Sequence, residues 1–127
     1  MSTRQEPPMI IRNWQDATPY VGHETAIIWT MLSEQTADAD GAVLQGLVSV
    51  TRHMMQAGKS GDYHDHDGLE QVYYITKGRG DMKLDGQIHP VKQGDCVHLP
   101  PKCKHQLINN SEDWIEHLII TARVPEA

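Results

Sequence analysis

Short apolar runs, each bounded by turn-forming residues, recur along most of the chain. The runs are too short for typical helices and are rich in Val, Ile, Tyr and Thr, so they predict β-strands. Asp85-Gly86, between two of these runs, is a strong signal for a two-residue hairpin turn. Strands are expected at residues 26–32, 44–55, 72–76, 81–84, 87–91, 96–99, 105–108 and 114–121, with a short extended piece at 9–14.

The spacing of these runs indicates the fold class. Strand signals that recur at roughly 8–12 residues, without a convincing amphipathic helix, favour an all-β sandwich or barrel. A length of 127 residues suits one domain. We therefore expect a single domain over residues 9–127, preceded by a loose, polar arm at residues 1–8.

Charge and hydropathy narrow the possible partners. Acidic residues outnumber Lys plus Arg by 17 to 11, and no basic cluster offers phosphate contacts, so nucleic-acid binding is not expected. No apolar stretch is long enough to span a membrane, and the N-terminus has no apolar signal core, which predicts a cytoplasmic protein. Cys96 and Cys103 form no CxxC pair and are expected to be free thiols.

The histidine content raises the question of a metal site, because the chain has eight histidines and no phenylalanine. His64 and His66 are two residues apart, and in an extended chain such side chains point to the same face. A third histidine, His105, follows a Pro-Pro turn. Three imidazoles and one oxygen ligand would hold a metal ion and leave two octahedral positions open.

The segment around His64 resembles the first of two cupin motifs. That motif is a glycine, five residues, HxH, three or four residues, a carboxylate, six residues and a glycine, and Gly58, His64, His66 and Gly78 fit it. The resemblance implies a cupin jelly-roll barrel, a double-stranded β-helix, over nearly the whole chain. It also implies one divalent transition metal ion per chain, which the sequence leaves open among Ni, Mn, Fe, Zn, Co and Cu.

A later segment resembles the second cupin motif. That motif is a glycine, five residues, proline, one residue, glycine, two residues, histidine, three residues and asparagine. Gly94, Pro100, His105 and Asn109 fit it, whereas Lys102 stands where the motif has its second glycine. His105 is thereby implied as the third imidazole ligand.

The fourth ligand departs from the family pattern. Counting six residues back from Gly78 places Gln71, rather than Glu70, in the slot for the carboxylate. Strand alternation puts these two side chains on opposite faces but does not choose between them, because both faces carry apolar residues. A neutral glutamine ligand would leave the site at a charge of about +2 and make the metal a stronger Lewis acid, less suited to Fe(III).

Two further residues are candidates for proton transfer. Tyr73 should share a face with Gln71, where its phenol could serve as an acid or base or could form a pocket wall. His53 could be a general base, or a partly exposed histidine of a strand. No role is assigned to His23, His89 or His117.

The expected function is that of a metal-dependent enzyme acting on a small polar or anionic substrate. Such a metal would assist isomerisation, cyclisation or elimination next to a carbonyl, and the ligand set resembles that of small cupins acting on unsaturated uronates. Alternatives are an Fe(II) dioxygenase and a non-catalytic small-molecule-binding module. A homodimer is expected through the apolar strand that carries Ile27, Ile28 and Trp29, because small barrels expose sheet edges.

Overall fold

The computed structural model describes residues 9–125, and the arm expected at residues 1–8 lies outside the described residues. The described chain is built from strands and one short 3-10 helix, η1 (Trp14–Asp16). No helix in this part of the chain is long and apolar enough to cross a membrane. The strands are β1 (Tyr20–Gly22), β2 (Ala26–Glu34), β3 (Ala42–Leu44), β4 (Leu47–Met55), β5 (Leu69–Lys77), β6 (Arg79–Leu84), β7 (Gln87–Lys92), β8 (Cys96–Leu99), β9 (His105–Ile108) and β10 (Ile115–Arg123).

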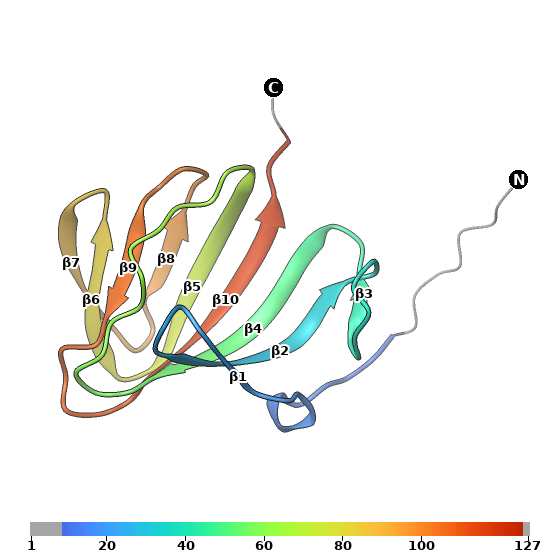
Figure 1. The fold of residues 1–127 in the computed structure, drawn as a ribbon, viewed down its shortest axis with the longest axis horizontal. Helices are drawn as coiled ribbons and strands as arrows, with labels where there is room; N and C mark the ends of the chain where they lie inside the picture. The colour runs from blue at the N-terminus through green and yellow to red at the C-terminus, as the bar shows by residue number, and fades with distance from the viewer. Residues whose placement is uncertain (1–8, 126–127) are drawn as a thin grey trace, which may run out of the picture.

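The strands form a large and a small sheet. The large sheet has the order β1-β2-β4-β10-β5-β8, with β3 paired to β2, and the small sheet has the order β7-β6-β9. All pairs are antiparallel except that of β2 with β3. Figure 1 shows the small sheet at the β8 and β5 side of the large one, with β2 and β3 at the far side. This arrangement is all-β, as the strand spacing predicts, and it is the double-stranded β-helix that the resemblance implies.

Alternation along the central strands decides which side chains enter the barrel. In β10 every second residue from Ile115 to Thr121 is buried, and the intervening residues are only partly buried. The inner face changes in character along the paired strands β10 and β4, from apolar at one end through imidazole to hydroxyl at the other. The pairs that show this are Ile115 with Met55, His117 with His53, Ile119 with Thr51, and Thr121 with Ser49.

The structure corrects some of the expected strands. The single strand expected at 44–55 is divided at Gln45-Gly46 into β3 and β4. Residues 9–13 of the extended piece belong to no strand, Trp14 at its end begins η1, and β1 was not predicted. In contrast, β8 and β9 have the expected bounds. Asp85 and Gly86 both have positive φ, as the hairpin signal requires.

Candidate metal centre

The connection between β4 and β5 (residues 56–68) brings the two motifs together. It runs beside β9, across the front of the small sheet in Figure 1. The His64 N–H donates to the His105 carbonyl at 3.0 Å, and the His105 N–H donates to the His64 carbonyl at 2.8 Å. Further along, the Gly61 N–H donates to the Leu107 carbonyl. The HxH segment is therefore held as an irregular extra strand against the strand that carries the third histidine.

The three predicted imidazoles converge. The Nε2 atoms of His64 and His66 lie 3.1 Å apart. His64, His66 and His105 each place a ring nitrogen within 4.8 Å of the others. Two ring nitrogens at such a separation either share a proton or bind a common cation. Bonds of about 2.1 Å at a right angle would hold two nitrogens about 3 Å apart.

Hydrogen bonds to the outer nitrogens orient these rings. Nδ1 of His64 donates to the Asp62 carbonyl at 3.1 Å, and Nδ1 of His105 donates to the Cys103 carbonyl at 3.0 Å. A neutral ring that donates from Nδ1 keeps its lone pair on Nε2. His105 Nε2 is buried and has no hydrogen-bond partner among the described residues. An unpaired buried acceptor costs about 1–3 kcal/mol, and a bound cation would remove that cost.

Burial also favours the neutral form of two of these imidazoles, His105 and His66. Desolvation, outweighing the hydrogen bond to Cys103, lowers the pKa of His105 to about 4, with further contributions from His64 and His66. Burial and the neighbouring His64 also lower the pKa of His66. A neutral imidazole can donate its lone pair to a metal ion near neutral pH. The donor type, the tautomers and the unpartnered nitrogen therefore fit a divalent transition metal.

Gln71 and Glu70 lie on opposite faces of β5. The Gln71 amide donates to Thr121 Oγ1 at 3.1 Å, and its Oε1 is buried without a partner among the described residues. Glu70 instead contacts His98 Nε2 at 3.0 Å on the exposed side. Gln71 lines a cavity that adjoins the one bordered by His64 and His105, and not that cavity itself.

Tyr73 and His53 are both inside the barrel. The alternative of a partly exposed His53 is wrong, because this residue is 3% exposed and its Nε2 contacts Thr51 Oγ1 at 2.9 Å. Burial, and then the nearby His117 and His23, lower the pKa of His53 to about 2. Burial, and then Asp62, raise the pKa of Tyr73 above its usual value. His53 is therefore a neutral imidazole and Tyr73 a protonated phenol.

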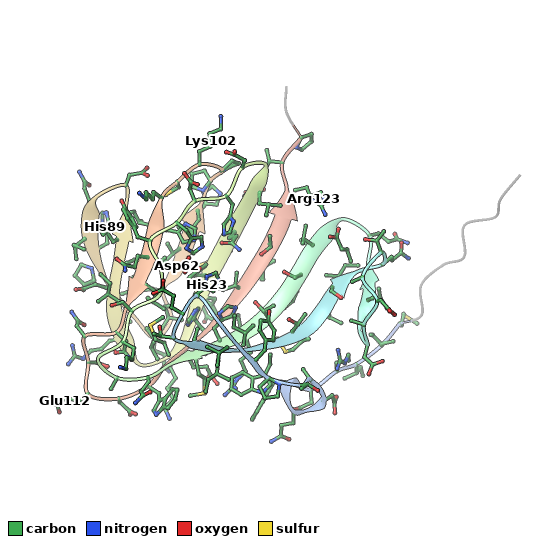
Figure 2. The ribbon with its side chains drawn as sticks, in the orientation of Figure 1. His23, Asp62, His89, Lys102, Glu112 and Arg123 are labelled. Atoms are coloured by element: carbon green, nitrogen blue, oxygen red, sulfur yellow. The ribbon has the colours of Figure 1, made fainter. Side chains whose placement is uncertain are left out.

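Two residues with no predicted role, His23 and Asp62, adjoin the centre. Figure 2 shows both at the middle of the molecule, between the sheets. Asp62 Oδ1 lies 3.1 Å from His23 Nδ1 and 3.3 Å from His64 Nδ1, and the two rings stack with centroids 4.8 Å apart. Burial opposes ionisation of Asp62, but His64 and His23 outweigh it and hold its pKa below the usual value. Asp62 therefore adds a negative charge that a count of ligands alone misses.

Asp62 could have been found from the sequence, because it stands two residues before His64 within the first motif segment. No sequence pattern points to His23, because it lies 39 residues from Asp62 along the chain. It lies in the turn between β1 and β2, where His23 and Glu24 have φ of 50° and 71°. Residues other than glycine adopt such angles only where the surroundings fix them.

The second motif departs from the pattern at Lys102, and the backbone explains the family preference. Lys102 has a φ of 69°, in the left-handed region that glycine adopts most readily. Its N–H donates to the His66 carbonyl at 2.9 Å, which ties the turn of the second motif to the HxH segment. The lysine therefore preserves the motif conformation, although its side chain makes that conformation less favourable.

Comparison with known proteins identifies the family of this chain. Residues 51–121 match the family described as Cupin domain. An uncharacterized protein of Methanocaldococcus jannaschii is 32% identical over 92 residues, which cover 72% of this chain and 68% of that protein.

Solved structures share the fold. A predicted oxalate decarboxylase from Thermotoga maritima superposes with a TM-score of 0.79 at 21% identity, covering 91% of this chain and 100% of that one. KdgF from Halomonas sp. superposes with a TM-score of 0.74 at 13% identity, covering 94% and 97%. These likenesses concern the barrel, and the sequence match covers more than half of the chain. The chain therefore belongs to the cupin family.

Proposed function

We propose that this chain binds one divalent transition metal ion through His64, His66, His105 and the amide oxygen of Gln71. The observation that carries the proposal is His105 Nε2, a buried lone pair that has no partner in the described part of the chain and lies beside two converging imidazoles. Gln71 Oε1 is a second buried acceptor to which no residue that the structure describes donates. Both atoms belong to residues that the two motifs place in the ligand set.

The function that this centre supports best is proton transfer next to a carbonyl of a small polar or anionic molecule, in an isomerisation, cyclisation or elimination. A divalent ion at the site supplies Lewis acidity toward a substrate oxygen. Tyr73 remains protonated at neutral pH, so it suits the donation of a proton better than its removal. His53 lines the same cavity with a neutral ring, although its Nε2 is already engaged by Thr51.

We also propose a homodimer. Ile28 belongs to the core, but Ile27 and Trp29 alternate with it on the outer face of β2 and are only partly buried. Because β2 is paired with β4 on one side and with β1 and β3 on the other, the partner would meet this outer face or displace a short strand. Light scattering at micromolar concentration should give twice the mass of the chain, and a monomer mass would contradict the proposal.

A reaction screen can test the enzymatic proposal without knowledge of the natural substrate. The protein is loaded separately with Ni, Mn, Fe, Zn, Co and Cu, then incubated in D₂O with unsaturated uronates and β-dicarbonyl compounds. We expect metal-dependent deuterium incorporation or rearrangement by NMR, and its loss in Tyr73→Phe. Substrate-dependent oxygen consumption by the Fe(II) form would instead support the dioxygenase alternative. Ligand binding without turnover would indicate a non-catalytic module.

A further inference from the structure

A second cavity adjoins the candidate metal centre and differs from it in chemistry. It has a volume of about 140 Å³, and its polar lining comes from Tyr20, Ser49, Thr51, Gln71 and Thr121, together with His23 and His53. The cavity beside His64 and His105 is much smaller, about 20 Å³, which is room for one water-sized occupant. His23 and His53 line both cavities, so the larger one lies next to the metal ligands.

The polar groups of this larger cavity are hydroxyls and an amide on neighbouring strands. Ser49 and Thr121 are register partners on β4 and β10, and Thr121 is also paired with Gln71 on β5. The Thr121 hydroxyl accepts the Gln71 amide proton at 3.1 Å, which leaves its own proton available to donate. Neutral groups that both donate and accept match the hydroxyls of a ligand.

Cationic groups are missing from the same surface. Among the described residues that line either cavity, none is a lysine or arginine. Arg123, at the end of β10, donates to both carboxylate oxygens of Glu34 at 2.7 and 2.8 Å, and Lys102 extends outward at the top of Figure 2. Asp62 adds a negative charge to the smaller cavity. A carboxylate placed away from the metal would lose part of its hydration there and would find no lysine or arginine to pair with among these lining residues.

We propose that the ligand of this site carries a single acidic group at the metal and a neutral, hydroxyl-bearing remainder in the cavity lined by Ser49, Thr51 and Thr121. This inference rests on the proposed metal centre. The substrates are then hydroxylated monocarboxylates, and Ser49 and Thr121 determine the specificity for the hydroxyl groups of the ligand. Ligands with a second, separate anionic group should bind more weakly to the same surface.

Three α-hydroxy acids form a matched set of probes, because lactate, glycerate and malate share the end that binds a metal. They differ in a methyl, a hydroxymethyl and a carboxymethyl group, and each is used as separate enantiomers. The protein is loaded with Co²⁺, and binding is followed by the visible absorption of the metal. We expect one enantiomer of glycerate to bind about 3- to 10-fold more tightly than lactate, the effect of one hydrogen bond. Malate should bind at least about tenfold more weakly than glycerate.

Variants assign the preference to the cavity. Ser49→Ala should remove most of the advantage of glycerate and leave lactate unchanged. Thr121→Val should also reduce the affinity for glycerate relative to that for lactate, and the two ligands are compared within this variant because it also removes the acceptor of the Gln71 amide. Thr36→Val, at an exposed position in the turn after β2, is the control and should change neither affinity.

The outcomes separate this inference from the metal proposal. Failure to bind Co²⁺ would refute the proposed centre and, with it, the inference that rests on it. Binding of Co²⁺ with malate as tight as glycerate, or an advantage of glycerate that survives both Ser49→Ala and Thr121→Val, would overturn the substrate class alone.

Discussion

The backbones of His64 and His105 are joined by two reciprocal hydrogen bonds of 3.0 and 2.8 Å. This pairing links an irregular connection to a regular strand, and it fixes two imidazoles from distant parts of the sequence. Assembly of the ligand set is therefore part of closing the barrel. Because a bound ligand stabilises the state that binds it, metal binding should stabilise the folded protein.

Asp62 should matter for metal affinity although it is not a proposed ligand. Asp62→Asn removes the negative charge beside His64 but keeps an amide oxygen that can accept from His23. The affinity for Co²⁺ should therefore fall by about tenfold or more through the lost charge. Metal titration against a chelator of known affinity measures this change. Asp67→Asn alters the same charge at an exposed position of the same segment and should have little effect. Equal losses of Co²⁺ affinity in the two variants would show that Asp62 acts only through the net charge of the segment and not through its position beside His64.

The fourth ligand can be tested by exchanging the two adjacent side chains. Gln71→Ala should weaken metal binding, and Gln71→Glu should tighten it because a carboxylate lowers the net charge of the centre. Glu70→Ala should leave the affinity nearly unchanged, since Glu70 contacts His98 on the outer side. Loss of metal from Glu70→Ala with retention in Gln71→Ala would show that the register is wrong by one residue.

Lys102 offers a test of the motif at the level of the backbone. Lys102→Gly should raise the free energy of unfolding by about 0.5 kcal/mol. Glycine removes the steric strain of a φ of 69°, and this gain exceeds the additional backbone entropy that glycine loses on folding. Lys104→Gly, two residues later and without a positive φ, should lower it by a similar amount. Urea unfolding of both variants measures the difference, and a destabilised Lys102→Gly would contradict this account of the motif.

The buried histidines should make the metal-free protein sensitive to acid. Burial, and then His117 and His23, lower the pKa of His53 to about 2. Burial, and then His23, lower the pKa of His117 to about 3. The unfolded chain binds protons near pH 6.5, so the stability from each neutral ring is complete above that pH and decreases as the pH falls below it. Between pH 7.5 and 5 the loss should be about 2 kcal/mol for each of these two rings.

Urea unfolding at several pH values in the presence of a chelator measures this slope. His117→Gln should reduce the slope by nearly one proton, whereas His89→Gln, at an exposed position on β7, should leave it unchanged. A stability that is constant between pH 7.5 and 5 would show that these rings accept protons in the folded state.

Local pattern in the sequence was sufficient for much of this fold. Turn residues and short β-branched runs gave the bounds of β8 and β9, and the HxH spacing gave the convergence of His64 and His66. These features depend on neighbours in the chain, where side-chain alternation and turn chemistry act directly.

Features that depend on distant contacts were not predictable in the same way. The approach of His23 to Asp62 requires the β1–β2 turn to fold over the centre, and no spacing in the sequence encodes that contact. Arg52 lies over the rings of Trp14 and Trp29 at 4.0 and 4.6 Å, which fixes η1 against the sheet. The residues of this stack are far apart in the sequence, and tertiary packing joins them.

The most direct test of the central claim is the metal content of the purified protein by mass spectrometry. After loading and removal of free metal, the parent chain and a His89→Ala control should each retain one divalent ion per chain. His64→Ala with His66→Ala should retain almost none, while circular dichroism still shows a folded β-sheet protein. Full metal occupancy in that folded double variant would contradict the assignment of the centre.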